Sequence, residues 1–323
     1  MKRIRLKRHA TTTLVTLSAL LMVCALAYAQ TWANEVSISE VGGHLHITSN
    51  GIPDHTPGQF PNNRNPNTIS PQLHQYRVPT NPKVSGRPTP IGMMPFGVAV
   101  NGVPFDPSAA EWWNRDPRSG WQYEALTGFT DLGMDQHNAH VQPGGTYHYH
   151  GYPNGLAKRL YHGEDMTLLG YAADGFPIYA PYAYIDPDDS SSGSKQVRSS
   201  YKLKRGNRPD GPGGEYDGTF VEDFEFIKNY GDLDECNGRT GVTPEFPDGT
   251  YHYFITENYP FIPRFFRGTP DDSFKRRGPP PGRGGRGGRG PGGRGGGGPG
   301  HHPPPHGGPP PHGPGGFPPP PPR

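Results

Sequence analysis

The amino-acid sequence predicts an all-β fold: a single β-sandwich or barrel-like domain with long Pro- and Gly-rich loops and a disordered C-terminal tail. Short runs of β-branched and aromatic residues recur about every ten residues, separated by Gly, Pro, Asn and Asp, which is the pattern of sandwiches and barrels. No long stretch shows apolar residues at the 3.6-residue period of an amphipathic helix. The 48 glycines and 42 prolines of the chain favour turns and work against long helices.

The domain is expected to span residues 36–268, which is long enough to bury a core. Strands are predicted within it at residues 44–49, 95–100, 146–150, 167–172, 178–182, 220–227 and 250–256. Short helices are expected only at residues 109–113 and 156–160. Prolines recur so often between residues 50 and 90 that we expect an extended loop there, wrapped on the domain surface.

The N-terminus has the features of a secretory signal peptide over residues 1–29. Five basic residues precede residue 9, an apolar run covers residues 14–26, and Ala27-Tyr28-Ala29 is a small-x-small cleavage site. The apolar run is shorter than the ~20 residues of a membrane span. The sequence therefore predicts a secreted or periplasmic protein that does not span a membrane after cleavage.

The other end of the chain, residues 278–323, is almost entirely Gly, Pro, Arg and His, with Phe317 as its only aromatic residue. Such a composition buries too little apolar surface to fold, so this tail is predicted to be disordered. Its Arg-Gly repeats would suggest nucleic acid in a cytoplasmic protein. Behind a signal peptide, a contact with an anionic cell-surface polymer or weak metal capture fits these repeats better, and a plain solvated tail is the leading alternative.

Charge and cysteine content limit the ligands and the disulfide bonds that we expect for the domain. Residues 30–274, which contain the domain, hold 18 basic residues and all 29 acidic residues of the chain, a net charge of −11; the other 13 basic residues lie in the signal segment and from Lys275 onward. An acidic domain does not suit nucleic acid and is compatible with divalent cations. Cys236 is the only cysteine beyond the signal segment, so no intramolecular disulfide is expected and a buried thiol is the default.

The stretch most indicative of chemistry is residues 133–151, which holds four of the fifteen histidines: His137, His140, His148 and His150. In a strand over residues 146–150, alternation places His148 and His150 on one face and the intervening tyrosines on the other. The Pro-Gly-Gly turn before this strand brings the upstream histidines back toward it.

Three neutral imidazoles, from His140, His148 and His150, would leave one position open on a tetrahedral metal ion, as in catalytic zinc sites. Nitrogen ligands also suit Cu(II), so the predicted cofactor is a divalent metal, zinc or copper. Asp135 is the candidate fourth ligand, or it orients one of the imidazoles. Alternatively, the run is a tyrosine-rich core strand whose histidines bond to the backbone.

Two further candidate cation sites are weaker. His44 and His46 share a strand face and form a second candidate set with His55, although surface histidines on a strand explain them equally well. The acidic, serine-rich residues 186–195 resemble a calcium loop, but such loops are more often simply solvated.

The sequence also contains a short internal repeat. Residues 145–150 (Gly-Thr-Tyr-His-Tyr-His) return at 249–254 as Gly-Thr-Tyr-His-Tyr-Phe. This predicts two matching turn-and-strand units. If they converged, His252 and the Asp-Glu-Cys corner at 234–236 would complete one site; we favour a site built from the first copy alone, because its ligands are close along the chain.

Several motifs together resemble the YHYH domain family. They are Asn-Gly-Ile-Pro-Asp-His at 50–55, Ala-His-Val-Gln-Pro at 139–143, Tyr-His-Tyr-His-Gly at 147–151, Asp-Gly-Phe-Pro-Ile-Tyr at 174–179, Leu-Asp-Glu-Cys-Asn-Gly-Arg at 233–239 and Asp-Gly-Thr-Tyr-His-Tyr-Phe at 248–254. The resemblance implies a secreted protein and favours His140 over His137 as a signature residue; it implies no particular activity. One departure is Phe265-Phe266, where the resemblance leads us to expect a cysteine able to pair with Cys236.

These observations lead to two hypotheses on function. In the first, a histidine-built metal site supports metal-activated hydrolytic chemistry, since motifs for a serine nucleophile, a phosphate loop and dinucleotide binding are missing from the sequence. In the second, the protein is a non-enzymatic extracellular module that binds glycan or cell-surface polymer, with Trp112, Trp113, Trp121 and the tyrosines as stacking surfaces.

Overall fold

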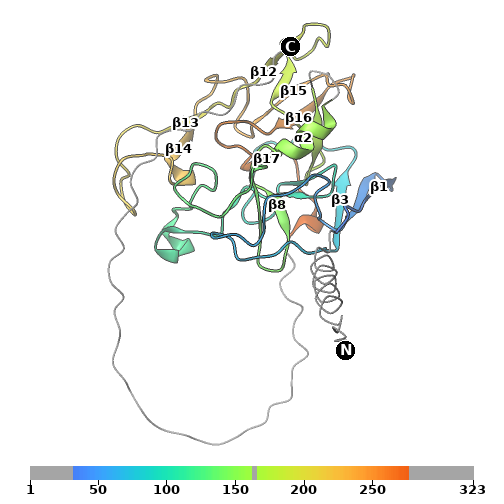
Figure 1. Cartoon of the computed structure of the whole chain (residues 1–323). Coiled ribbons are helices and arrows are strands. Elements are labelled where there is room, and N and C mark those ends of the chain that lie inside the picture. Colours follow the sequence, from blue (N-terminus) through green and yellow to red (C-terminus); the bar gives the residue numbers. More distant parts are fainter. Residues whose placement is uncertain (1–31, 162–165, 276–323) are drawn as a thin grey trace, which may run out of the picture. The chain divides into compact units, whose positions relative to one another are not determined.

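The structure is a computed structural model that describes residues 32–161 and 166–275. The predicted signal peptide and C-terminal tail lie outside these residues. The described chain is built mainly from short strands (Figure 1), so the all-β prediction is confirmed. Where the chain is described, no helix is both long and apolar enough to cross a membrane.

The main element is an eight-stranded sheet. Its strands, in order across the sheet, are β15 (Gly238–Gly241), β16 (Thr250–Phe254), β10 (Pro177–Tyr179), β9 (Leu168–Ala172), β5 (Gly97–Ala99), β6 (Pro104–Phe105), β8 (Tyr147–Tyr149) and β7 (Ala139–Val141). Since β15 and β7 are edges, the sheet is open, and the barrel-like variant of the predicted fold is wrong.

Smaller elements surround this sheet. An antiparallel sheet contains β1 (Val36–Val41), β2 (His44–Ser49) and β3 (His74–Pro79). Two-stranded pairs join β4 (Thr89–Pro90) to β17 (Phe265–Phe266), β11 (Tyr182–Tyr184) to β12 (Ser194–Gln196), and β13 (Tyr201–Leu203) to β14 (Phe224–Phe226). The helices within residues 32–161 and 166–275 are α2 (Asn154–Leu160) and the 3₁₀ turns η1 (Trp113–Arg115), η2 (Pro117–Ser119), η3 (Val221–Asp223) and η4 (Asp272–Phe274).

The strand order has an internal two-fold symmetry. In each half, an outer antiparallel hairpin (β7–β8 or β15–β16) pairs in parallel with β6 or β10, which in turn pairs with β5 or β9. The halves meet where β5 and β9 run antiparallel. The short sequence repeat at residues 145–150 and 249–254 is therefore one part of a larger structural repeat.

Two glycines explain the close approach at the centre of the sheet. A Cβ on Gly97 would lie 2.4 Å from the carbonyl oxygen of Tyr171, and a Cβ on Gly170 would lie 2.2 Å from that of Val98. Each glycine faces the same backbone position of the opposite half, so the symmetry extends to the residues that allow the two halves to pack.

Most predicted strands are present, with specific corrections. The predicted strand at 178–182 is divided between β10 and β11, and that at 220–227 begins as the turn η3. Residues 109–112 are not helical, since η1 begins at Trp113. The segment 50–90 is not a loop throughout, because β3 forms within it and is buried at Tyr76 and Val78.

Candidate metal centre

The outer hairpin of one half presents the three predicted histidines. His140 on β7 lies directly opposite His148 on β8, and His150 follows β8 by one residue. The intervening turn is closed by a hydrogen bond from the Gln142 N–H to the Thr146 carbonyl (2.9 Å). The strand alternation of period two then places His148 and His150 on the same face.

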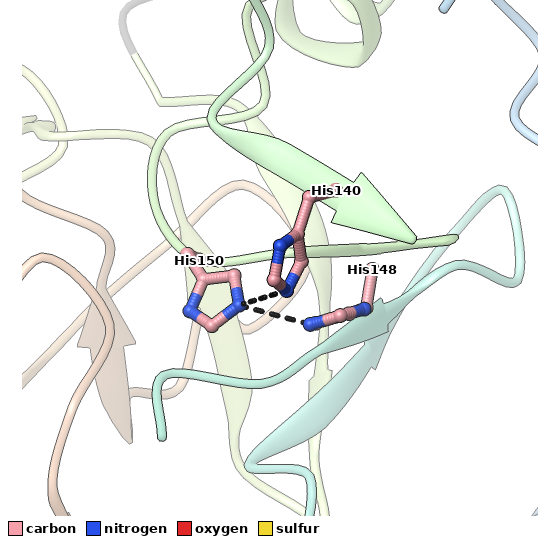
Figure 2. A group of neighbouring side chains, drawn as sticks. All are labelled: His140, His148 and His150. Atoms are coloured by element: carbon pink, nitrogen blue, oxygen red, sulfur yellow. Dashed lines mark hydrogen bonds between the residues drawn. The ribbon is translucent and has the colours of Figure 1, made fainter. Parts of the chain in front are cut away.

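The three imidazoles converge, as Figure 2 shows. The Nε2 atom of His150 lies 2.9 Å from that of His148 and 3.2 Å from that of His140. Among the described residues, these three histidines form the group of side chains that could hold a metal ion, with ligand atoms within 4.8 Å of one another. Nitrogens bound tetrahedrally to zinc at ~2.0–2.1 Å are about 3.3 Å apart, so only small shifts separate this arrangement from a coordinated one.

Hydrogen bonds to the backbone fix which nitrogens carry protons. The Nδ1 of His140 lies 2.9 Å from the Leu132 carbonyl and that of His148 lies 3.3 Å from the Thr146 carbonyl. A carbonyl accepts only, so each Nδ1 carries the hydrogen, and each Nε2 of a neutral ring presents a lone pair. Two lone pairs therefore point at the Nε2 of His150.

His150 cannot satisfy this arrangement by itself. With its proton on Nε2, its buried Nδ1 is an acceptor without a donor, because the Pro107 carbonyl beside it can only accept. With its proton on Nδ1, three lone pairs would face one another. A cation at the centre satisfies all three Nε2 atoms and leaves the His150 proton facing the Pro107 carbonyl. The residues present thus fit a metal ion.

Burial favours the neutral form of His140 and His150, which is the form that binds a metal. Burial lowers the pKa of His140, and it lowers the pKa of His150 well below 6.5, with further lowering from the positive charge that His148 and His140 would carry. His148 and His150 are only 1% and 2% exposed, whereas His140 is half-buried. His140 is thus the ring of the cluster nearest to solvent.

Charged residues that sequence analysis missed surround the cluster. The carboxylates of Glu111 and Asp106 both raise the pKa of His140, and Asp106 is buried. Arg264 lowers the pKa of His150 and forms a buried ion pair with Glu124. These contacts join residues far apart in the chain, so no local pattern marks them.

Asp135 has a different place from that of the three imidazoles. Its carboxylate accepts hydrogen bonds from the backbone N–H groups of Gly58 and His137, at 2.9 and 2.8 Å, and from the Tyr147 hydroxyl at 2.7 Å. It is not a member of the convergent group. Asp135 therefore holds the turn before β7, and its charge raises the pKa of His140.

The second copy repeats this hairpin without the metal-ligating set. Asp234 accepts from its own downstream N–H groups and from Tyr251, as Asp135 does from His137, Ala139 and Tyr147. The turn asparagines Asn138 and Asn237 have φ values of 54° and 55°. At the positions equivalent to the three clustered histidines, the second hairpin has Arg239 for His140, His252 for His148 and Phe254 for His150.

His252 therefore does not complete the first site. Its strand, β16, is separated from β8 by β10, β9, β5 and β6. The His252 ring is fully buried against Tyr179 and Phe254. The preference for a cluster built from the first copy agrees with this geometry.

A family comparison covers both hairpins. The family described as YHYH protein matches residues 75–268. The chain belongs to the YHYH family. The predicted membership is confirmed, and the match includes both halves of the sheet and the three clustered histidines. No curated protein and no solved structure matched the chain.

In this YHYH protein the second candidate histidine set is not brought together. His44 and His46 lie on β2, whereas the Nε2 of His55 contacts the Tyr149 hydroxyl at 2.8 Å and its ring packs on His137. The acidic segment 186–195 forms the loop and edge of the β11–β12 hairpin, and its carboxylates are not a metal-ligating group in the described chain.

A surface pocket of about 500 Å³ is linked to the histidine cluster through one residue, Glu111. Its walls include Glu111, Trp112, Arg115 and Tyr123. Glu111 connects the two sites electrostatically, since it also acts on His140. Trp121 is excluded as a stacking surface, because it is buried and its indole N–H donates to Asp210 (3.0 Å).

Proposed function

We propose that this YHYH protein is exported and binds one divalent metal ion, zinc or copper, through the Nε2 atoms of His140, His148 and His150. The observation that carries the proposal is the convergence of three Nε2 atoms. No placement of protons on the rings gives every nitrogen of the cluster a hydrogen-bond partner. Three nitrogen ligands match the protein share of a catalytic zinc site and also suit Cu(II).

Hydrolysis is the reaction class that we assign to this centre. A metal ion held by three neutral imidazoles has an open position and supplies Lewis acidity to a water molecule or a substrate carbonyl there. His140 is the half-buried ligand, so the open position faces solvent most readily on its side. Glu111 lines the neighbouring pocket and acts on His140, which makes it the candidate to accept a proton from water.

Metal analysis tests the first part of this proposal. The mature chain without an affinity tag should retain about one zinc or copper ion more than His148→Ala, measured by mass spectrometry after gel filtration. His150→Phe is a second informative variant, because Phe254 occupies the equivalent position of the second hairpin. Equal metal content in the wild type and both variants would refute the site.

A second candidate function has its own support. The pocket near the metal centre presents Trp112 and Tyr123 together with Arg115 and Glu111, the combination of flat rings and charges that binds sugars. A non-enzymatic glycan-binding module would then bind an oligosaccharide equally well with and without metal. Titration of oligosaccharides into the wild type and Trp112→Ala, followed by tryptophan fluorescence, distinguishes this function from the first. The basic tail remains a proposed contact for an anionic cell-surface polymer.

A further inference from the structure

A second pocket lies on the hairpin that lacks the histidine cluster. Its volume is about 560 Å³, which is in the range of small-ligand sites. Its walls include Lys228, Asp234, Glu235, Tyr251 and Arg267. The two-fold repeat of the sheet shows what the equivalent surface holds in the other half.

In the first half, a segment of the chain itself covers that surface. The Gly58 N–H donates to the Oδ2 atom of Asp135 (2.9 Å), and the Phe60 ring packs edge-on against Tyr147, with ring centroids 6.2 Å apart. A Cβ on Gly58 would lie 2.4 Å from the Cβ of Asp135, so only glycine fits there. The covering segment, residues 56–61, is Thr-Pro-Gly-Gln-Phe-Pro.

In the second half, the Asp–Tyr pair is repeated but the cover is not. Asp234 receives hydrogen bonds from Cys236, Gly238 and Tyr251 within the described residues. No N–H group of the described residues bonds to Asp234 as that of Gly58 bonds to Asp135, and the pocket opens beside Asp234 and Tyr251. The hairpin thus keeps the groups that hold an extended Pro-Gly segment, with space in place of that segment.

The charges around this pocket favour an acidic ligand. Lys228 and Arg267 form no close ion pair within the described chain, although the charge of Arg267 acts on Asp234 and opposes the rise in pKa that burial causes there. Asp232 is already paired with Lys195 at 2.6 Å. The backbone N–H groups of Cys236 and Gly238 bond to Oδ1 of Asp234, so its Oδ2, which among the described residues only Tyr251 contacts, can accept one more N–H, as Oδ2 of Asp135 does from Gly58. Lys228 and Arg267 are the cations available to a carboxylate, with Asp234 and Glu235 as the opposing acids.

We propose that this pocket binds an extended peptide in which Pro-Gly is followed by an acidic residue. The glycine N–H of the peptide donates to Asp234 as Gly58 donates to Asp135, and an apolar residue packs on Tyr251 as Phe60 packs on Tyr147. The acidic side chain of the peptide lies near Lys228 and Arg267. This site is independent of the metal centre, which is on the other hairpin.

Three blocked, fluorescently labelled hexapeptides test the proposal by anisotropy with the full mature chain. The first is Thr-Pro-Gly-Glu-Phe-Pro, the second keeps Gln in place of Glu, and the third has Ala in place of Gly. The Glu peptide should bind at least about fivefold more tightly than the Gln peptide, which corresponds to one favourable ion pair. The Ala peptide should not bind measurably, for the steric reason seen at Gly58.

The double variant Lys228→Glu plus Arg267→Glu provides the matched control. It should abolish the preference for the Glu peptide and leave the circular dichroism spectrum and the metal content of the chain unchanged. Equal affinity for the Gly and Ala peptides would overturn the proposal, as would an unchanged preference in the double variant or no binding of any peptide. Binding of an acidic oligosaccharide in place of all three peptides would assign the pocket to a different class of ligand.

Discussion

Replacement of His148 and His252 by alanine, each in a separate variant, gives a matched test of the metal centre. Both rings are buried, at 1% and 0% exposure, on equivalent strands. Both place Nδ1 against the carbonyl two residues upstream, at 3.3 and 3.0 Å. Only His148 faces another imidazole of the convergent cluster. The two substitutions remove similar core contacts, but only His148→Ala also removes a proposed metal ligand.

The expected magnitude follows from the number of ligands. Structural zinc sites are worth about 10–16 kcal/mol over four ligands, so one ligand contributes about 3 kcal/mol, or roughly a hundredfold in affinity. Metal at about a hundred times the dissociation constant stabilises the folded state by about 2.7 kcal/mol. For a domain of this size that corresponds to a rise in melting temperature of about 5–10 °C, and His148→Ala should reduce the rise to about 1 °C.

Differential scanning fluorimetry of the wild type and both variants, with and without zinc or copper, measures this difference. His252→Ala should have a lower melting temperature than the wild type without metal, because it loses a packed ring, yet it should show the same metal-induced rise. Equal rises in His148→Ala and the wild type would refute the metal centre. A lost rise in both variants, with circular dichroism unchanged, would show that the two hairpins contribute to one site.

Two further predictions concern stability. Burial lowers the pKa of His74 and His252 from 6.5 to about 4, so the unfolded state takes up protons that the folded state does not. The metal-free protein should therefore lose stability as the pH falls from 6.5 to 4, by up to about 3 kcal/mol for each ring in urea titrations; a flat profile would contradict this. Arg264→Ala should lower the free energy of unfolding, measured in urea, by about 3–5 kcal/mol, because it leaves the Glu124 carboxylate buried without its partner. Arg118→Ala, which removes the exposed ion pair with Asp116, should leave the urea midpoint of unfolding unchanged.

The histidine cluster was predictable because its geometry is local. A strand of period two places His148 and His150 on one face, and a tight turn brings His140 back opposite His148. The position of Asp135 was not fixed in this way. A carboxylate near a turn competes for backbone N–H groups, and here Gly58 and Tyr147, which the sequence did not connect with it, complete its hydrogen bonds.

The remaining parts depend on contacts between distant segments. The short sequence repeat at 249–254 indicated two matching units, but the structural repeat also includes the turns at Gly102 and Gly175, where the two sequences share little beyond Gly and Pro. Likewise, β3 forms in a proline-rich segment because β2 supplies a hydrogen-bonding partner over six residues. Tertiary pairing of this kind overrides local propensity, and a single sequence does not display it.

The two-fold repeat leads to a final prediction, in which the second hairpin gains a metal site. Arg239 and Phe254 stand where the first hairpin has His140 and His150, and His252 already occupies the position of His148. The backbone turn that sets these positions has the same φ at Asn138 and Asn237. The double variant Arg239→His plus Phe254→His should therefore rebuild the three-imidazole cluster.

Without metal this double variant should be less stable than the wild type by about 1–3 kcal/mol, because a buried ring nitrogen then lacks a partner. With metal it should bind one zinc or copper ion more than the wild type and recover part of that loss, measured by metal analysis and by melting curves. Arg239→His alone, which supplies two imidazoles, is the control and should not gain the ion. If the double variant folds and its metal content equals that of the wild type, the geometric equivalence of the hairpins is insufficient to form the centre. Groups found only in the first half, such as Asp106, Glu111 and the Pro107 carbonyl, must then be part of it.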